Sequence, residues 1–317
     1  MASQSGTAQV QPVPSTFVAR LRVYFREMYP LGRSLFVGYL LCFELYFLTL
    51  LTNDRTGFNV GPAEVSVGFT LFAFLLNLRI ADDFKDYQTD LTLFPDRPLP
   101  SGRTRKSDLV WVLVVLDTVV VGLNVVVVRN HVFFALLVAY GVLMSFWFFQ
   151  RYRIQRSLVL AVVTHNPVQL VMNTYVISFA CARYDIALVG WNNLLILCTL
   201  YFPGLIWEIA RKVRAPQDET EYVTYSSLFG VRKAVGFIAA VMLLDLVTSS
   251  ILAYQLYPWA VWTVVAAYAW LVWQCIRFVR NPARGPLVDK IIVYEFAAEG
   301  SMTVFIAARL LGLGHVA

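Results

Sequence analysis

The sequence predicts an all-α membrane domain that crosses the bilayer many times. Of its 317 residues, 58% are hydrophobic and only 15% are charged, and the mean hydropathy is +0.63. Soluble domains carry about 25% charged residues, and they lack repeated apolar stretches of roughly 20 residues. The composition therefore places the chain in the membrane class, as one transmembrane domain.

Nine apolar stretches are long enough to cross about 30 Å of hydrocarbon as helices. We expect these helices to surround a central cavity that is closed at one end by a cap of polar loops. Residues 1–17 are polar and rich in Gln, Ser and Pro, so we expect a disordered tail before a single transmembrane domain at 18–317. In chain order the stretches are Ser34–Leu51, Pro62–Ala81, Asp108–Val128, His131–Phe149, Ser157–Ala180, Ile186–Trp207, Lys233–Leu252, Pro258–Val279 and Ile291–Leu311.

The basic residues predict the orientation of these spans. If successive loops lie on alternating sides of the membrane, 22 of the 26 Lys and Arg residues fall on the side of the N-terminus. The opposite side holds Arg55, Arg129, Arg183 and Arg309. By the positive-inside rule, the N-terminus and the loop after Asp82 face the cytoplasm. The net charge of +6 is thus explained by topology and an anionic substrate, and no nucleic-acid-binding motif competes with this interpretation.

A row of three carboxylates interrupts the apolar sequence after the second span. Asp82, Asp86 and Asp90 recur every four residues, so a continuing helix places them on one face. Like charges at this spacing destabilise a bare helix, and the row therefore favours bound cations. Oxygen ligands without nearby His or Cys are typical of Mg²⁺, which commonly bridges carboxylates to substrate phosphates.

Basic residues surround this row. Basic side chains bind an anionic diphosphate, and carboxylates bind the metal ion that accompanies it. The two groups side by side are therefore typical of a diphosphate site. The alternative is a charged loop that is merely kept in water at a membrane surface. The residues concerned are Arg79, Lys85, Arg97, Arg103, Arg105 and Lys106.

The pattern D-x-x-x-D-x-x-x-D, followed by Arg97-Pro98-Leu99-Pro100-Ser101-Gly102, resembles the first signature of the UbiA superfamily of intramembrane prenyltransferases. That signature is N-x-x-x-D-x-x-x-D with a following R-P-L. The resemblance implies nine spans, and it implies that Asp86 and Asp90 hold Mg²⁺ on an isoprenoid diphosphate. Asp82 stands where the family usually has Asn, although Asn77 takes that place if the helix shifts register.

A second polar loop follows the sixth span, on the same side of the membrane as the first. Its place matches the superfamily's second acidic signature, although Ala215 stands where an Asp is common. Arg211 and Lys212 are candidate diphosphate clamps, the alternative being that they only set topology. The candidate metal ligands are Glu208, Asp218 and Glu219.

Polar residues inside the spans mark a second candidate region. Glu44, Asp117 and Asp245 fall near the bilayer midplane, where ionisable groups are costly and commonly functional. The fifth span contains Pro167, which should bend its helix. Around this proline we expect a row that lines the substrate pocket, with core packing as the alternative: His165, Asn166, Gln169 and Asn173.

Together these features predict a Mg²⁺-dependent enzyme that ionises an isoprenyl diphosphate within the membrane. We expect the prenyl group to pass to a lipophilic acceptor, with an aromatic acceptor favoured; the alternative is a terpene cyclase in which the chain's own double bonds capture the cation. A transporter would explain the intramembrane acids but not the two acid-base loops. The expected catalytic residues are Arg79, Lys85, Arg97, Arg211 and Lys212, with Asn77, Arg103 and the row around Pro167 binding substrate.

Overall fold

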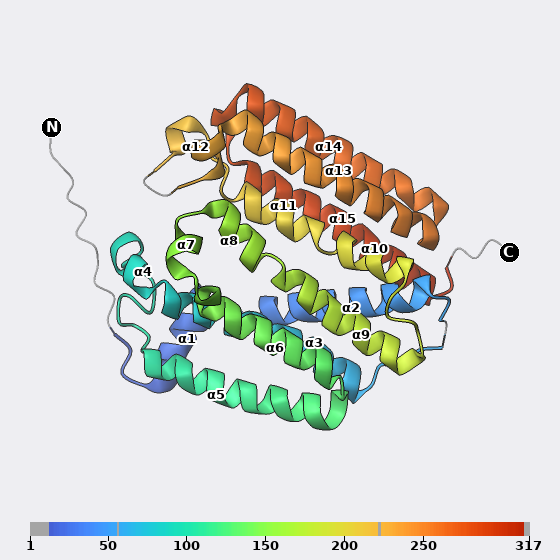
Figure 1. The fold of residues 1–317 in the computed structure, drawn as a ribbon, viewed down its shortest axis with the longest axis horizontal. Helices are drawn as coiled ribbons and strands as arrows, with labels where there is room; N and C mark the ends of the chain where they lie inside the picture. The colour runs from blue at the N-terminus through green and yellow to red at the C-terminus, as the bar shows by residue number, and fades with distance from the viewer. Residues whose placement is uncertain (1–12, 56, 221–222, 314–317) are drawn as a thin grey trace.

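A computed structural model describes residues 13–55, 57–220 and 223–313. Every regular element in these ranges is a helix, and the long helices lie side by side in one bundle (Figure 1). The helices are α1 (Phe17–Glu27), α2 (Leu31–Thr52), α3 (Pro62–Lys85), α4 (Tyr87–Leu93), α5 (Lys106–Leu123), η1 (Asn124–Val128), α6 (His131–Ser145), η2 (Trp147–Phe149), α7 (Arg151–Gln155), α8 (Leu158–His165), α9 (Val168–Tyr184), α10 (Trp191–Thr199), α11 (Phe202–Ala210), η3 (Pro216–Asp218), α12 (Tyr225–Phe229), α13 (Val231–Leu256), η4 (Pro258–Ala260), α14 (Val261–Arg280), η5 (Pro282–Arg284) and α15 (Leu287–Leu310).

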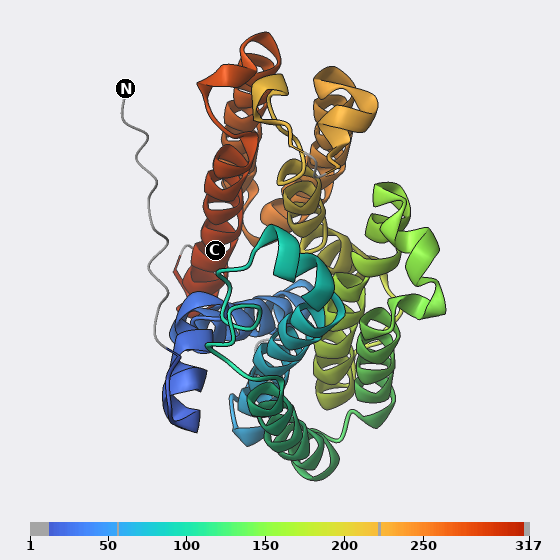
Figure 2. The same cartoon turned by 90° about the vertical axis from the view of Figure 1, so that its left-hand side faces the viewer.

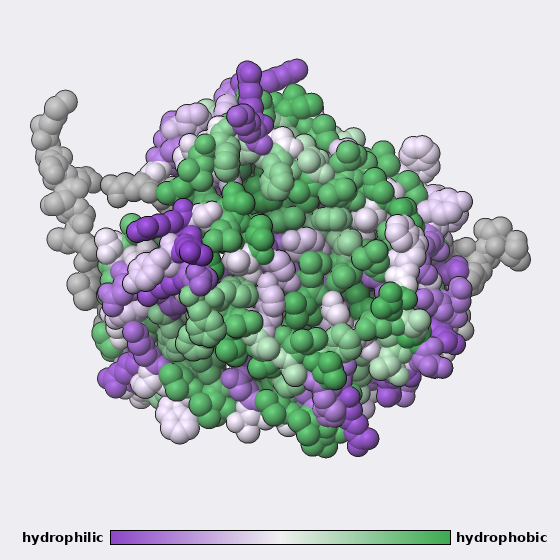
Figure 3. All heavy atoms as spheres, viewed as in Figure 1, coloured by the Kyte–Doolittle hydropathy of each residue, from purple (hydrophilic) through white to green (hydrophobic). Residues whose placement is uncertain are grey.

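Seven helical segments of the described chain are long and apolar enough to cross a membrane. They coincide with seven of the predicted spans, counting α10 and α11 as one and the turns η1 and η4 with their neighbours. The protein is an integral, multi-pass membrane protein. The surface agrees with this assignment. The middle of the visible face is largely hydrophobic, and hydrophilic residues gather toward the helix ends (Figure 3).

The other two predicted spans are interrupted or short. The fifth is split into α8 and α9 at Asn166 and Pro167, which confirms the predicted bend, because proline cannot continue the hydrogen bonding of a helix. The fourth was expected to reach Phe149, but α6 ends at Ser145. Residues 147–149 instead adopt positive φ angles of 54°, 49° and 57°, a left-handed backbone that stops the helix.

The helices share a core that joins the two halves of the chain. Tyr46 and Leu48 of α2, Tyr175 of α9, Leu252 of α13 and Phe305 of α15 belong to one cluster of buried side chains. Because early and late helices bury residues together, the bundle from α2 to α15 forms one structural unit.

Short helices and loops gather at one end of the bundle, which we term the polar end and define by residues 82–106, 147–157, 211–220 and 223–230. The elements α1, α4, α7 and α12 lie at this end in both views (Figures 1 and 2). Helix α1 begins at Phe17, capped by Thr16, whose hydroxyl accepts a hydrogen bond from the Ala19 backbone at 3.3 Å. The predicted tail therefore ends slightly before residue 17, and its residues 1–12 lie outside the described part.

Candidate active site at the polar end

The three predicted carboxylates lie on a nearly continuous helical path. Helix α3 ends at Lys85 and α4 starts at Tyr87, with Asp86 between them. The backbone N–H of Asp86 donates to the carbonyl of Asp82, and that of Asp90 donates to Asp86, both at 2.9 Å. The i, i+4 register that the spacing predicts is therefore maintained through the break between the helices.

Two of these carboxylates are ion-paired within the same segment. Lys85 Nζ lies 2.7 Å from Asp82 Oδ1, and Arg97 donates to both oxygens of Asp90 at 2.9 and 2.8 Å. Asp86 has no such partner among the described residues. Burial raises the pKa of the Asp86 carboxyl to about 6, an effect that the charge of Lys85 opposes and those of Asp82 and Asp90 reinforce. The row thus holds one carboxylate that a cation would stabilise.

The cation at Arg79 is directed elsewhere. It pairs with Asp83, a buried neighbour of the row that also accepts a hydrogen bond from Tyr24 of α1 at 2.6 Å. Sequence reasoning overlooked Asp83, because a second Asp beside Asp82 does not fit the four-residue spacing. Asn77, the alternative for the family's Asn, donates instead to Asp117 of α5.

The second loop brings its own acid-base cluster to the polar end. At the end of α11, Glu208 accepts from Arg211 and lies 3.0 Å from Lys212. Lys212 is only 7% exposed. Glu219 accepts hydrogen bonds from the hydroxyls of Thr224 and Ser226, at 2.7 and 2.6 Å, and so holds its own loop together.

His165, the last residue of α8, is in contact with residues of the polar end. The indole of Trp147 contacts the imidazole, with ring centroids 5.2 Å apart, and the Lys85 ammonium lies 4.6 Å from the centre of the Trp147 ring. The structure thus brings together residues from α3, η2 and α8, and the sequence analysis did not single out Trp147.

The contacting side chains of Trp147 and His165 each bury a nitrogen, Nε1 and Nε2, that has no hydrogen-bond partner within the described chain. Buried polar groups are normally satisfied, so these two nitrogens are open to a polar ligand. The described chain has other unsatisfied buried atoms as well, among them those of Asn77, Arg79 and Asn166.

Other predicted residues have structural partners away from this point. Arg103 is buried and pairs with Glu27 of α1. Gln169 donates to Asn173 at 2.9 Å, and Asn173 is fully buried against α10. Both contacts fit the packing alternative better than a role in lining a pocket. Asp218 is exposed in the second loop.

The carboxylates fit a magnesium site that substrate oxygens complete. No three Asp, Glu, His or Cys side chains converge on a point that could hold a metal ion, in the residues that the structure describes. Mg²⁺ commonly takes only one or two carboxylates and fills its remaining positions with water and substrate phosphate. Asp86, flanked by Asp82 and Asp90, offers such a partial set.

Neither a protein-family model nor a curated protein matches the sequence. A solved structure of digeranylgeranylglyceryl phosphate synthase in membranes aligns with a TM-score of 0.59 over 90% of this chain and 98% of the other, at 12% identity. The chain shares the fold of that protein. This fold confirms the predicted all-α, multi-pass architecture. The number of spans, the central cavity, the polar cap and the roles of the side chains stay predictions.

Proposed function

We propose that the protein ionises an isoprenyl diphosphate in the membrane and transfers the prenyl group to a lipophilic acceptor. The observation that carries this proposal is the gathering of two acid-base loops at one end of an apolar bundle, with Lys85 paired to Asp82, Lys212 paired to Glu208, and His165 in ring contact with Trp147, over which Lys85 lies. An amphiphile with an anionic head and a hydrocarbon tail matches that arrangement, because its head meets cations while its tail stays among apolar helices. The shared fold with a prenyltransferase supports the same activity.

The basic residues would act on the diphosphate. Lys85 pairs with Asp82 of the first loop and Lys212 with Glu208 of the second, and Arg97 and Arg211 lie beside the acids of each loop. As the bond to the prenyl carbon breaks, negative charge grows on the departing diphosphate. Cations that are already positioned by ion pairs stabilise this charge with little reorganisation.

Asp86, with Asp82 and Asp90, would hold Mg²⁺ at the first loop, and Glu208 is the candidate ligand at the second. When bound, the metal would neutralise diphosphate oxygens and so make the diphosphate a better leaving group. By this proposal the polar end faces the cytoplasm, the side that the basic residues favour.

Aromatic rings around His165 keep a terpene cyclase as the second candidate. Trp147 and Phe148 contact His165 at centroid distances of 5.2 and 5.7 Å, and Tyr140 contacts Phe148 at 5.5 Å. Ring faces stabilise a nearby cation, which serves both transfer and cyclisation. A cyclase forms terpene products without any acceptor, whereas a transferase requires one.

The decisive assay supplies geranyl, farnesyl and geranylgeranyl diphosphates with Mg²⁺ to the purified protein, with and without a lipophilic aromatic acceptor. We expect diphosphate release and prenylated acceptor. We also expect Asp86→Asn to lower release by at least about 100-fold, because it removes the carboxylate that has no cation of its own. Asp96→Asn, an exposed carboxylate outside the row, is the matched control.

Cyclic products at full rate without acceptor would replace the transferase proposal by the cyclase. Near-normal diphosphate release by Asp86→Asn would remove this residue from the metal site.

A further inference from the structure

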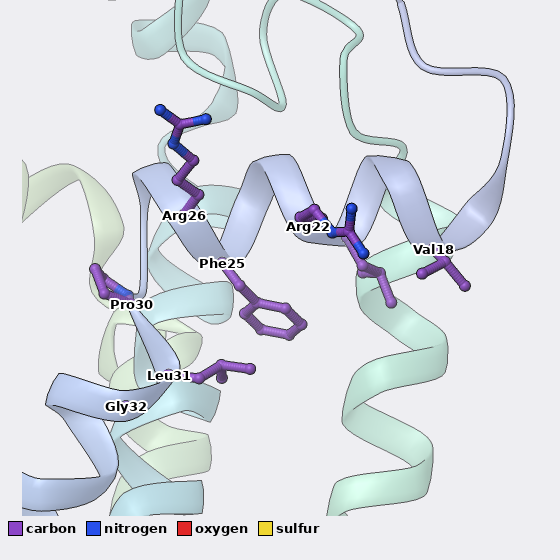
Figure 4. Close-up of a pocket in the computed structure, with 8 residues that line it drawn as sticks. Val18, Arg22, Phe25, Arg26, Pro30, Leu31 and Gly32 are labelled. Carbon is purple, nitrogen blue, oxygen red and sulfur yellow. The ribbon is translucent and has the colours of Figure 1, made fainter.

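An apolar groove lies where α1 turns into α2, with a volume of about 610 Å³. Its lining residues are Val18, Leu21, Arg22, Phe25, Arg26, Pro30, Leu31 and Gly32. A volume of this size lies in the range of small-molecule sites, roughly 300–1,000 Å³. Figure 4 shows Phe25 and Leu31 pointing toward the same space below α1.

Helix α1 is held in place by residues on its opposite side. Arg20 pairs with Asp108 of α5 at 2.6 Å, and both side chains are buried. Tyr24 reaches Asp83 of α3. With this face fixed, the side carrying Val18 and Arg22 is directed outward, and both residues are exposed. Helix α1 therefore presents an amphipathic outer face, which is typical of helices at a membrane interface.

The groove carries positive charge that the described residues do not pair with acids. Arg22 and Arg26 are one helical turn apart, and neither forms a hydrogen bond or ion pair with the described residues. None of the eight lining residues is acidic. Glu27, the nearest acid on α1, is taken by Arg103. An occupant with a net negative head is therefore favoured over a zwitterion, whose ammonium would meet no carboxylate.

The apolar part of the groove continues onto the outer surface of the first span. Leu31, Leu35 and Phe36 of α2 are 42%, 39% and 65% exposed. A hydrocarbon chain that leaves the groove can thus follow α2 into the bilayer without losing apolar contact. The charged part of the groove thus matches an anionic headgroup, and its apolar part matches the hydrocarbon chain of the same molecule.

We propose that this groove binds an anionic phospholipid, with Arg22 and Arg26 on its phosphate and an acyl chain along Phe25, Leu31 and the start of α2. The site is separate from the residues assigned to diphosphate chemistry. Because arginine presents several donors to phosphate oxygens, it is well suited to this contact.

The test is native mass spectrometry of the full chain in non-ionic detergent, titrated with phosphatidylglycerol or phosphatidylcholine of identical acyl chains. We expect preferential binding of phosphatidylglycerol. The double variant Arg22→Gln/Arg26→Gln should bind it about 30-fold more weakly, from roughly five-fold per charge. The matched control is Arg232→Gln/Arg280→Gln, which removes two exposed charges outside the groove.

A second pair of variants tests the apolar part without changing charge. A Cβ at Gly32 or at Gly236 would have no heavy atom within 4 Å, so a leucine side chain can start from either position without a clash at its Cβ. Gly32→Leu fills the groove and should weaken phosphatidylglycerol binding, while Gly236→Leu on α13 should leave it unchanged.

Equal binding of the two lipids, or equal behaviour of each variant and its control, overturns the proposal. Competitive displacement of phosphatidylglycerol by farnesyl diphosphate, added without Mg²⁺, overturns it differently: the occupant would then be the isoprenyl diphosphate and not a structural lipid.

Discussion

Lys212 is a buried cation whose charge is balanced by one neighbour, Glu208. Lysine is almost never buried without a partner. If it grips the departing diphosphate, Lys212→Gln should lower diphosphate release about 100-fold. Arg232→Gln, which removes an exposed charge at the start of α13, should not. Loss of activity only in first-loop variants would reduce the second loop to a determinant of topology.

Asp245 illustrates an intramembrane acid with a structural role. Its carboxylate accepts a hydrogen bond from Tyr294 of α15 at 2.6 Å and one from Ser249 at 3.0 Å, and it is only 1% exposed. Tyr294→Phe leaves one oxygen without its donor, so we expect a loss of about 1–3 kcal/mol in stability. Thermal unfolding in detergent measures it. Tyr254→Phe, at an exposed position of α13, should have no effect, and an equal effect of both would contradict the assignment.

Residue patterns predicted the register of the carboxylate row, and they did not predict the partners of the charged residues. The spacing of Asp82, Asp86 and Asp90 was sufficient to place them on one face, because the register is local. The partners of Arg103 and Glu219 could not be predicted, since Glu27 is 76 residues from Arg103 and the hydroxyls that bind Glu219 belong to a loop without periodicity. Trp147 was visible only as one aromatic residue among many.

At the scale of elements, α2 and α3 meet at a glycine. A Cβ on Gly38 would lie 3.0 Å from both the Cα and the backbone nitrogen of Phe72. Because backbone cannot move aside as a flexible side chain can, Gly38→Ala should force the helices apart and cost about 1–3 kcal/mol. Gly236→Ala, in open space on α13, should be neutral or stabilising by up to about 1 kcal/mol. Far-UV circular dichroism melts of both variants would compare them, and equal melting temperatures would contradict close packing at Gly38.

Hydropathy predicted where helices form, and it failed where local backbone geometry decides. The break at Pro167 was predictable because proline removes a backbone donor. The end of α6 was not predictable, because the next residues are all apolar and look like a continuation of the span: Phe146, Trp147, Phe148 and Phe149. The left-handed turn of residues 147–149 occurs where Trp147 packs against His165 and Lys85, contacts that local sequence does not indicate.

For the whole molecule, a ligand that bridges the two loops should stabilise the fold. Since no three metal-binding side chains converge among the described residues, we expect Mg²⁺ alone to change the melting temperature little. Mg²⁺ with inorganic diphosphate should protect the protein, by about 2.7 kcal/mol when the ligand is at 100 times its Kd. The Asp86→Asn variant should lose this protection, whereas Asp96→Asn should retain it. Full protection by Mg²⁺ without diphosphate would mean that the carboxylates form a complete metal site by themselves, and the substrate-completed site proposed here would be wrong.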